Sequence, residues 1–151
     1  MATPNKVIEY VDKVKPNVYG QEEKFQWLCD LDGMIKRTVM QEEDGVRYSY
    51  PEDMDTQLLV PHPWESIYAL YLKAQIDLQN KDYEDYNNAV LVFNERLDEY
   101  KRAYIREKAS ASSKSKGYIK PGVYTIVAED GIWLKLKSGE GWISSKYVTK
   151  L

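Results

Sequence analysis

The longest regular apolar pattern in this sequence lies between Tyr83 and Tyr104. Apolar side chains recur there at alternating gaps of three and four residues, at Tyr83, Tyr86, Val90, Phe93, Leu97, Tyr100 and Tyr104. Such a seam predicts a helix over residues 83–108 that packs along a second long helix. The partner is either the preceding helix of the same chain, in an antiparallel hairpin, or a neighbouring subunit, and we favour the hairpin.

Three further helices are predicted before this seam. Thr3-Pro4 is typical of an N-cap followed by proline in the first turn, and Pro16 ends the helix that starts there. A second helix ends near Gln41, and a third spans residues 63–80. The body of the chain, residues 1–108, is therefore predicted to be mainly α, a four-helix bundle with one long irregular loop.

That loop, Glu42–Pro63, separates the second helix from the third. Asp44-Gly45 is a turn signal, and three prolines disfavour helix at the residues before them. Loops of this length in a compact domain are often functional, and we interpret this one as a contact arm. Its candidate interface residues, with the start of the next helix, are Tyr48, Tyr50, Leu58, Leu59, Val60 and Trp64.

The C-terminal part differs from the body in composition and in charge. Residues 109–117 are rich in Ser and Lys and read as a linker. Residues 109–151 carry seven Lys and three acidic residues, a net charge of +4, whereas the remainder carries 14 basic and 21 acidic residues, a net charge of −7. Alternating apolar residues and turn signals predict a small antiparallel β module over residues 118–151. A sheet of this size is marginal alone, so we expect it to rest on another surface.

Most aromatic residues of the chain have a polar group, since there are 13 Tyr and 4 Trp against 2 Phe. Tyr and Trp bury apolar area while keeping a polar group near water, which suits subunit interfaces and also the edges of an ordinary core. Outside the loop, the candidate interface residues of this kind are Tyr100, Tyr104, Trp133, Trp142 and Tyr147.

The sequence offers no set of residues for catalysis. The chain has one Cys, Cys29, and one His, His62, which argues against disulfides, multi-cysteine zinc sites and His-pair metal sites. His62 lies between two prolines and reads as structural, and Cys29 lies on an amphipathic helix without a basic neighbour. We expect no enzyme activity, no cofactor and no metal. We also expect no membrane span, no signal peptide and, at a net charge of −3, no specific nucleic-acid binding.

The body resembles a family of small helical proteins from tailed phages, the head–tail connector or portal adaptor proteins. The resembling segments are Val7–Asn17, Phe25–Leu28, Asp55–Glu65, Tyr68–Leu72, Tyr86–Asn88 and Phe93–Tyr100. This resemblance implies a structural virion protein that joins the portal to the next neck or tail component. It implies a homo-oligomeric ring of about twelve subunits, matching the portal, through whose lumen DNA passes without specific binding.

The C-terminal segments Gly122–Val127 and Trp133–Tyr147 resemble the second half of a bacterial SH3 domain, most specifically at Gly141–Tyr147. The first half of such a domain is missing, so we expect an open sheet edge that pairs with a strand of another protein. This resemblance implies the alternative function, a cell-wall-binding SH3-like module of a phage lytic system.

Overall fold

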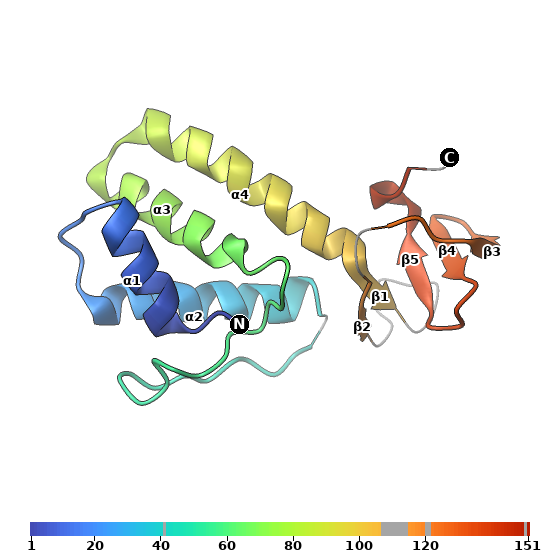
Figure 1. The fold of residues 1–151 in the computed structure, drawn as a ribbon, viewed down its shortest axis with the longest axis horizontal. Helices are drawn as coiled ribbons and strands as arrows, with labels where there is room; N and C mark the ends of the chain where they lie inside the picture. Colours follow the sequence, from blue (N-terminus) through green and yellow to red (C-terminus); the bar gives the residue numbers. More distant parts are fainter. Residues whose placement is uncertain (41, 107–114, 120–121, 150) are drawn as a thin grey trace.

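The computed structural model describes residues 1–40, 42–106, 115–119, 122–149 and 151. Four helices come first along the chain: α1 (Pro4–Val14), α2 (Gln21–Thr38), α3 (Ser66–Asn80) and α4 (Tyr83–Ala103). Five short strands and one 3-10 turn follow: β1 (Tyr104–Arg106), β2 (Ser115–Tyr118), β3 (Ile126–Asp130), β4 (Trp133–Leu136), β5 (Trp142–Ser144) and η1 (Ser145–Tyr147). The fold is mainly α with a small antiparallel β module, as predicted (Figure 1).

The ends of the helices follow local sequence signals. The Thr3 side chain caps α1 by accepting a hydrogen bond from the Lys6 amide, and Pro4 occupies the first turn. Acidic residues begin α2 and α4, where they oppose the positive end of the helix dipole. Between α3 and α4 the chain reverses at Lys81, whose φ of 63° is the left-handed conformation common after a helix end.

Helix α3 lies at the centre of the helical body. It contacts α1, α2 and α4, and it is the main helix on which α4 packs. The two are consecutive and lie side by side in opposite directions, which confirms the predicted antiparallel hairpin (Figure 1). Rings of Tyr71 and Phe93 meet at 5.4 Å between centroids, and those of Trp64 and Tyr100 at 5.8 Å. Within the seam, Phe93, Leu97 and Tyr100 are buried, whereas Tyr83 at its start is 58% exposed.

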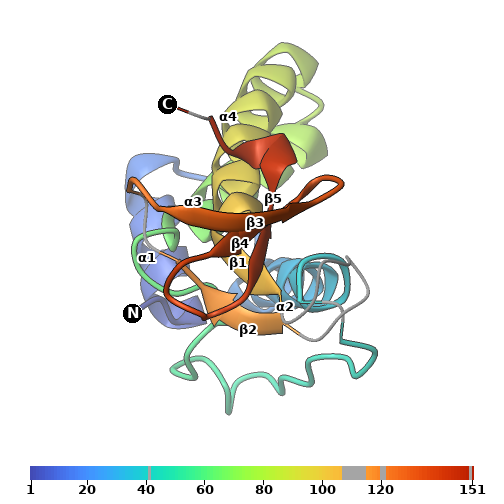
Figure 2. The ribbon, with the colours of Figure 1, turned by 90° about the vertical axis from the view of Figure 1, so that its right-hand side faces the viewer.

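The strands form one antiparallel sheet in the order β2-β1-β5-β4-β3. Figure 2 shows this sheet at the end of the molecule where α4 finishes. Leu134, Leu136 and Ile143 form a second small core beneath it, against Ile119 and Ile126. Gly131, at a φ of 59°, makes the turn between β3 and β4, where a side chain would be strained.

The predicted end of the fourth helix is wrong. Helix α4 ends at Ala103 rather than at residue 108, and Tyr104 begins β1 instead of ending the helical seam. Strand β1 pairs with β2 on one side and with β5 on the other. The chain thus supplies strands on both sides of β5, and β2 starts within the segment predicted as linker. Pairing of an open sheet edge with a strand of another protein stays a prediction. Residues 109–114 of that linker lie outside the described residues.

Within the described ranges, no helix combines the length and the apolar character that crossing a bilayer requires.

Candidate functional site

A buried carboxylate lies between α2, α3 and the long loop. Asp32 has no exposed surface and accepts three hydrogen bonds. The Tyr68 hydroxyl donates at 2.5 Å, the Tyr48 hydroxyl at 2.8 Å and the Leu59 backbone N–H at 3.1 Å. The Tyr68 oxygen in turn accepts the Val60 N–H at 2.7 Å. We call these five residues the Asp32 cluster.

The helical periods of α2 and α3 bring the Asp32 cluster together. Asp32 follows Leu28 by one turn and precedes Ile35 by almost one turn, so it shares their core-facing stripe. Tyr68 is fully buried in the first turns of α3. An unpaired polar group at such a depth costs several kcal/mol, roughly 2–7 on transfer scales, so the donors are required for the fold.

Burial raises the pKa of Asp32, and the hydrogen bonds from Tyr68, Tyr48 and Leu59 oppose this effect. Burial and the nearby Asp32 carboxyl also raise the pKa values of both tyrosines, so their hydroxyls stay protonated and serve as donors. The carboxyl is sealed from solvent, so no substrate reaches it. The Asp32 cluster therefore holds the loop against α2 and α3.

Further contacts fix the outer part of the loop. The Asp53 carboxylate accepts the Ser49 N–H at 2.7 Å and the Thr56 hydroxyl at 2.9 Å, closing a turn at the tip. The Asn5 N–H donates to the Met54 carbonyl at 2.8 Å, and the Leu58 N–H donates to the Ala2 carbonyl at 3.0 Å. The loop is thus fastened to the N-terminal segment as well as to α2 and α3.

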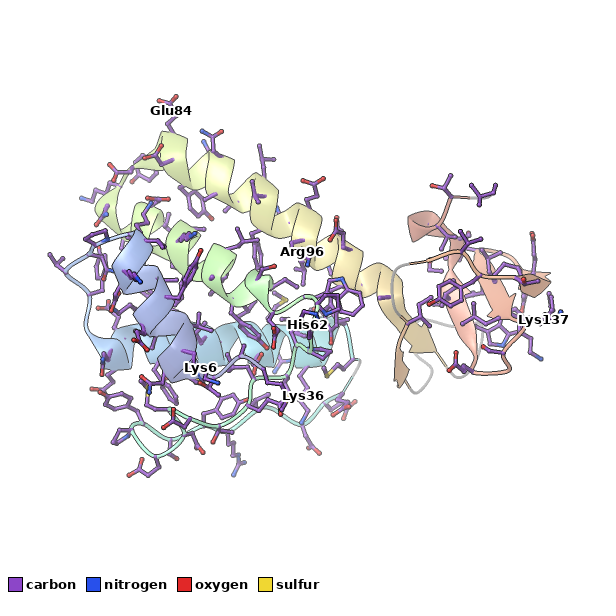
Figure 3. The ribbon with its side chains drawn as sticks, viewed as in Figure 1. Lys6, Lys36, His62, Glu84, Arg96 and Lys137 are labelled. Atoms are coloured by element: carbon purple, nitrogen blue, oxygen red, sulfur yellow. The ribbon has the colours of Figure 1, made fainter. Side chains whose placement is uncertain are left out.

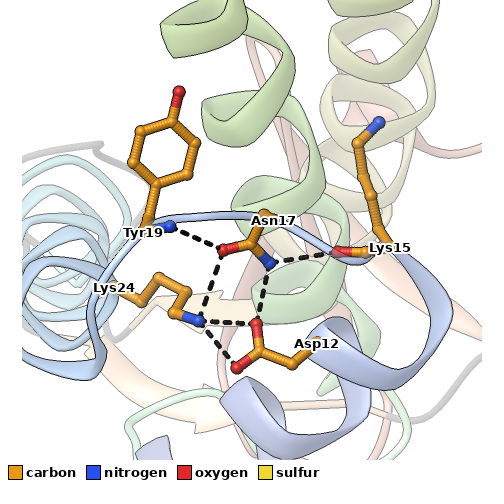
Figure 4. A network of polar contacts seen from close by, with 5 residues as sticks. All are labelled: Asp12, Lys15, Asn17, Tyr19 and Lys24. Atoms are coloured by element: carbon orange, nitrogen blue, oxygen red, sulfur yellow. Dashed lines mark hydrogen bonds and ion pairs between the residues drawn. The ribbon is translucent and has the colours of Figure 1, made fainter.

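A second polar network fastens the connection between α1 and α2 (Figure 4). The Lys24 ammonium, whose side chain is 3% exposed, contacts both Asp12 carboxylate oxygens, at 2.5 and 2.7 Å. Asn17 donates to Asp12 at 2.8 Å and accepts the Tyr19 N–H at 3.1 Å. The Tyr19 hydroxyl reaches Asn80 at the end of α3, at 2.7 Å. Lys15 forms an ion pair with the buried Asp77 of α3.

The single cysteine and the single histidine lie in different surroundings. Cys29 lines an open groove between α2 and residues 42–48, and burial with nearby Asp32 and Asp30 raises the pKa of its thiol to about 11. The side chain of His62 is 83% exposed, with Nδ1 3.5 Å from the Glu65 carboxylate (Figure 3). Both residues were predicted to be non-catalytic, and this stays a prediction.

The predicted interface residues divide into core and surface. Leu58, Val60, Trp64 and Tyr100 are at most 2% exposed, so the prediction that they form a contact surface needs correction. Leu58, Val60 and Trp64 fill the core because the loop folds back onto α2 and α3. Tyr100 lies on α4 and packs against Trp64. Tyr50 is exposed, whereas Tyr48, Leu59, Trp133 and Trp142 are partly exposed. The side chains of Tyr104 and Tyr147 lie outside the description.

Sequence reasoning missed the Asp32 cluster. The available signal was a lone acidic residue inside the apolar stripe of the second helix, with Leu28, Leu31 and Ile35 around it. Such a residue requires buried donors, and tyrosines elsewhere in the chain were the candidates.

No group of three or more His, Cys, Asp or Glu residues suited to a metal ion occurs in the described part of the chain. Comparison with protein-family models, with curated proteins and with solved structures finds no match to this chain.

Proposed function

We propose that this chain is a structural protein of a tailed-phage virion, a head–tail adaptor that joins the portal to the next neck or tail component. In this proposal the helical body is a four-helix bundle that assembles into a ring of about twelve copies, and DNA passes through its lumen. The β module is a partial SH3-like unit, and the protein resides in the virion. The chain binds neighbours and turns over no substrate.

The observation that carries this proposal is that the buried charged groups hold segments of the chain together. Asp32, Lys24 and Asp77 are the buried charged residues in the described part, and each is engaged in fastening one segment to another. None is open to a substrate. Two buried ion pairs hold α1 and its end against α2 and α3, and Asp32 fixes the 27-residue connection between α2 and α3, residues 39–65. Such a fold suits a protein that presents a rigid contact surface.

The resemblance to portal adaptor proteins adds the identity of the neighbour. One of the resembling segments, Asp55–Glu65, is the part of the loop that packs into the core and leads into α3. The same loop presents an acidic outer part, since residues 42–57 carry six acidic residues and one Arg. An acidic surface near a DNA channel avoids adhesion of the phosphate backbone.

The direct test is co-expression of the full chain with a phage portal protein, followed by electron microscopy of the purified portal. We expect added density of cyclic symmetry on the portal. A Tyr50→Ser/Glu52→Lys variant at the exposed loop should reduce occupancy, whereas Glu9→Lys on the exposed side of α1 should not. A bare portal beside a monomeric chain would overturn the proposal. Retention of the full chain by purified peptidoglycan, with the portal left bare, would favour the cell-wall-binding alternative.

A further inference from the structure

Helix α4 has an outer face that no other part of the described chain covers. Among the helices it packs mainly on α3, and the opposite side carries Leu91, 68% exposed, and Val92, 51% exposed. Glu84 and Glu95 are exposed on the same side, seven residues before Leu91 and four after it. Neither carboxylate has an ion pair within the described ranges. We call Glu84, Leu91, Val92 and Glu95 the α4 stripe.

The β module presents a surface of opposite charge. In β4, Leu134 and Leu136 face the small core, so Trp133 and Lys135 lie on the other face of the sheet. Trp142 of β5 pairs with Lys135, and the Lys135 ammonium lies 5.9 Å from the centre of its ring. Lys135 and Lys137 are exposed, and both Trp side chains are partly exposed. We call Trp133, Lys135, Lys137 and Trp142 the β4 patch.

Within one chain, the start of the α4 stripe lies far from the β4 patch. At 1.5 Å per residue, α4 separates Glu84 from the start of the sheet by about 30 Å. Figure 3 shows Glu84 and Lys137 at opposite ends of the molecule. The charge of the whole sequence follows the same division, −7 up to residue 108 and +4 after it. Two copies placed head to tail satisfy both surfaces.

We infer that the α4 stripe of one copy docks on the β4 patch of the next copy. Leu91 and Val92 pack on the two Trp rings, and Glu84 and Glu95 face Lys135 and Lys137. Such a contact joins two different surfaces, so it continues from copy to copy and closes only as a ring. The inference rests on the proposed function, because a ring also requires copies of this chain to associate. It adds which two surfaces make the contact.

The test is sedimentation velocity of the full-length chain over a wide concentration range at low salt. We expect the natural chain to self-associate. A stripe variant, Glu84→Lys/Glu95→Lys, and a patch variant, Lys135→Glu/Lys137→Glu, should each weaken association by about tenfold or more, because lysines then face lysines or glutamates face glutamates. The exposed control pairs Glu9→Lys/Glu22→Lys and Lys6→Glu/Lys146→Glu change the charge equally and should leave association unchanged.

Mixing the two variants gives the decisive result. Each contact between unlike copies then joins opposite charges, so we expect association to return, with the two variants alternating. A natural chain that stays monomeric, a mixture that fails to associate, or controls as damaging as the variants would overturn the inference. Portal decoration by a chain whose association ignores these changes would leave the proposed function standing. Association that depends on these charges, in a chain that does not bind the portal, would support the inference and overturn the proposed function.

Discussion

Asp32 shows how one residue decides the path of a long segment. A carboxyl in the apolar stripe of α2 is costly unless donors reach it, and the donors come from α3 and from the loop. The position of Asp32 in the stripe is evident from the sequence. The identity of its partners is not, because Tyr48, Leu59 and Tyr68 are 16, 27 and 36 residues away in a chain with 13 tyrosines.

Removal of the Tyr68 hydroxyl should destabilise the fold. In Tyr68→Phe, the Asp32 carboxyl loses its closest donor and the Val60 N–H loses its acceptor, both in the core. We expect the free energy of unfolding to fall by about 1–3 kcal/mol, measured by urea denaturation. Tyr10→Phe, at a ring that is 51% exposed, is the control and should change it by less than about 0.5 kcal/mol. Equal effects of the two changes would contradict the role of the Asp32 cluster.

The raised pKa of Asp32 gives a pH dependence of defined sign. Its folded-state pKa lies above the ordinary 3.8, so its contribution to stability is full below that value and is lost as pH rises through the folded-state pKa. Asn at this position does not titrate. The difference in unfolding free energy between the natural chain and Asp32→Asn should therefore decrease from pH 4 to pH 7, by at most ~1.4 kcal/mol per pH unit. Urea denaturation across this range measures it, and a difference that grows with pH would refute the assignment.

The environment of Cys29 predicts an unreactive thiol. A pKa of about 11 instead of 9.0 leaves about a hundredfold less thiolate at pH 8, and the thiolate is the nucleophile. Alkylation by iodoacetamide should be slower than that of a free cysteine by roughly this factor, followed by mass spectrometry of the folded chain. The denatured chain provides the control, since it should react at the ordinary rate. Equal rates in both states would show that the thiol is not shielded.

At the scale of elements, helix interiors were predictable and one junction was not. The Thr3-Pro4 start, the break near Lys81 and the α3–α4 hairpin follow from capping, turn and periodicity signals. The end of α4 was missed because Tyr104 continues the apolar spacing of the helix, while Tyr, Ile and Arg serve a strand as well. Pairing of β1 with β2 and β5 depends on segments distant in sequence, so local pattern could not reveal it.

The network between α1 and α2 contains a buried charge whose partner can be removed. Asp12→Ala leaves the Lys24 ammonium, 3% exposed, with only the Asn17 carbonyl oxygen at 3.4 Å. We expect a loss of about 2–3 kcal/mol of unfolding free energy, whereas Lys24→Met, which removes the buried charge itself, should cost less than about 1.5 kcal/mol. Thermal and urea denaturation of both variants test this order. A larger loss in Lys24→Met would mean that the ion pair stabilises the fold by more than its desolvation cost.

At the scale of the whole molecule, the distribution of charge follows from the sequence, whereas the exposure of apolar side chains does not. The sequence predicted the acidic body and basic C-terminal part, but it could not separate apolar residues that fill the core from those that remain outside. Leu58, Val60, Trp64 and Tyr100 were expected at an interface and are buried, whereas Leu91 and Val92 were not singled out and are exposed. The difference arises because α4 packs mainly on α3 and leaves its opposite face exposed, which is a property of the tertiary arrangement.

We propose that this chain acts by binding neighbouring proteins in a larger assembly. Native mass spectrometry of purified portal rings mixed with the full chain tests it most directly. The account predicts that the mass of the ring increases by whole multiples of one chain, up to a number that matches the symmetry of the portal. A ring of unchanged mass beside free single chains would contradict it.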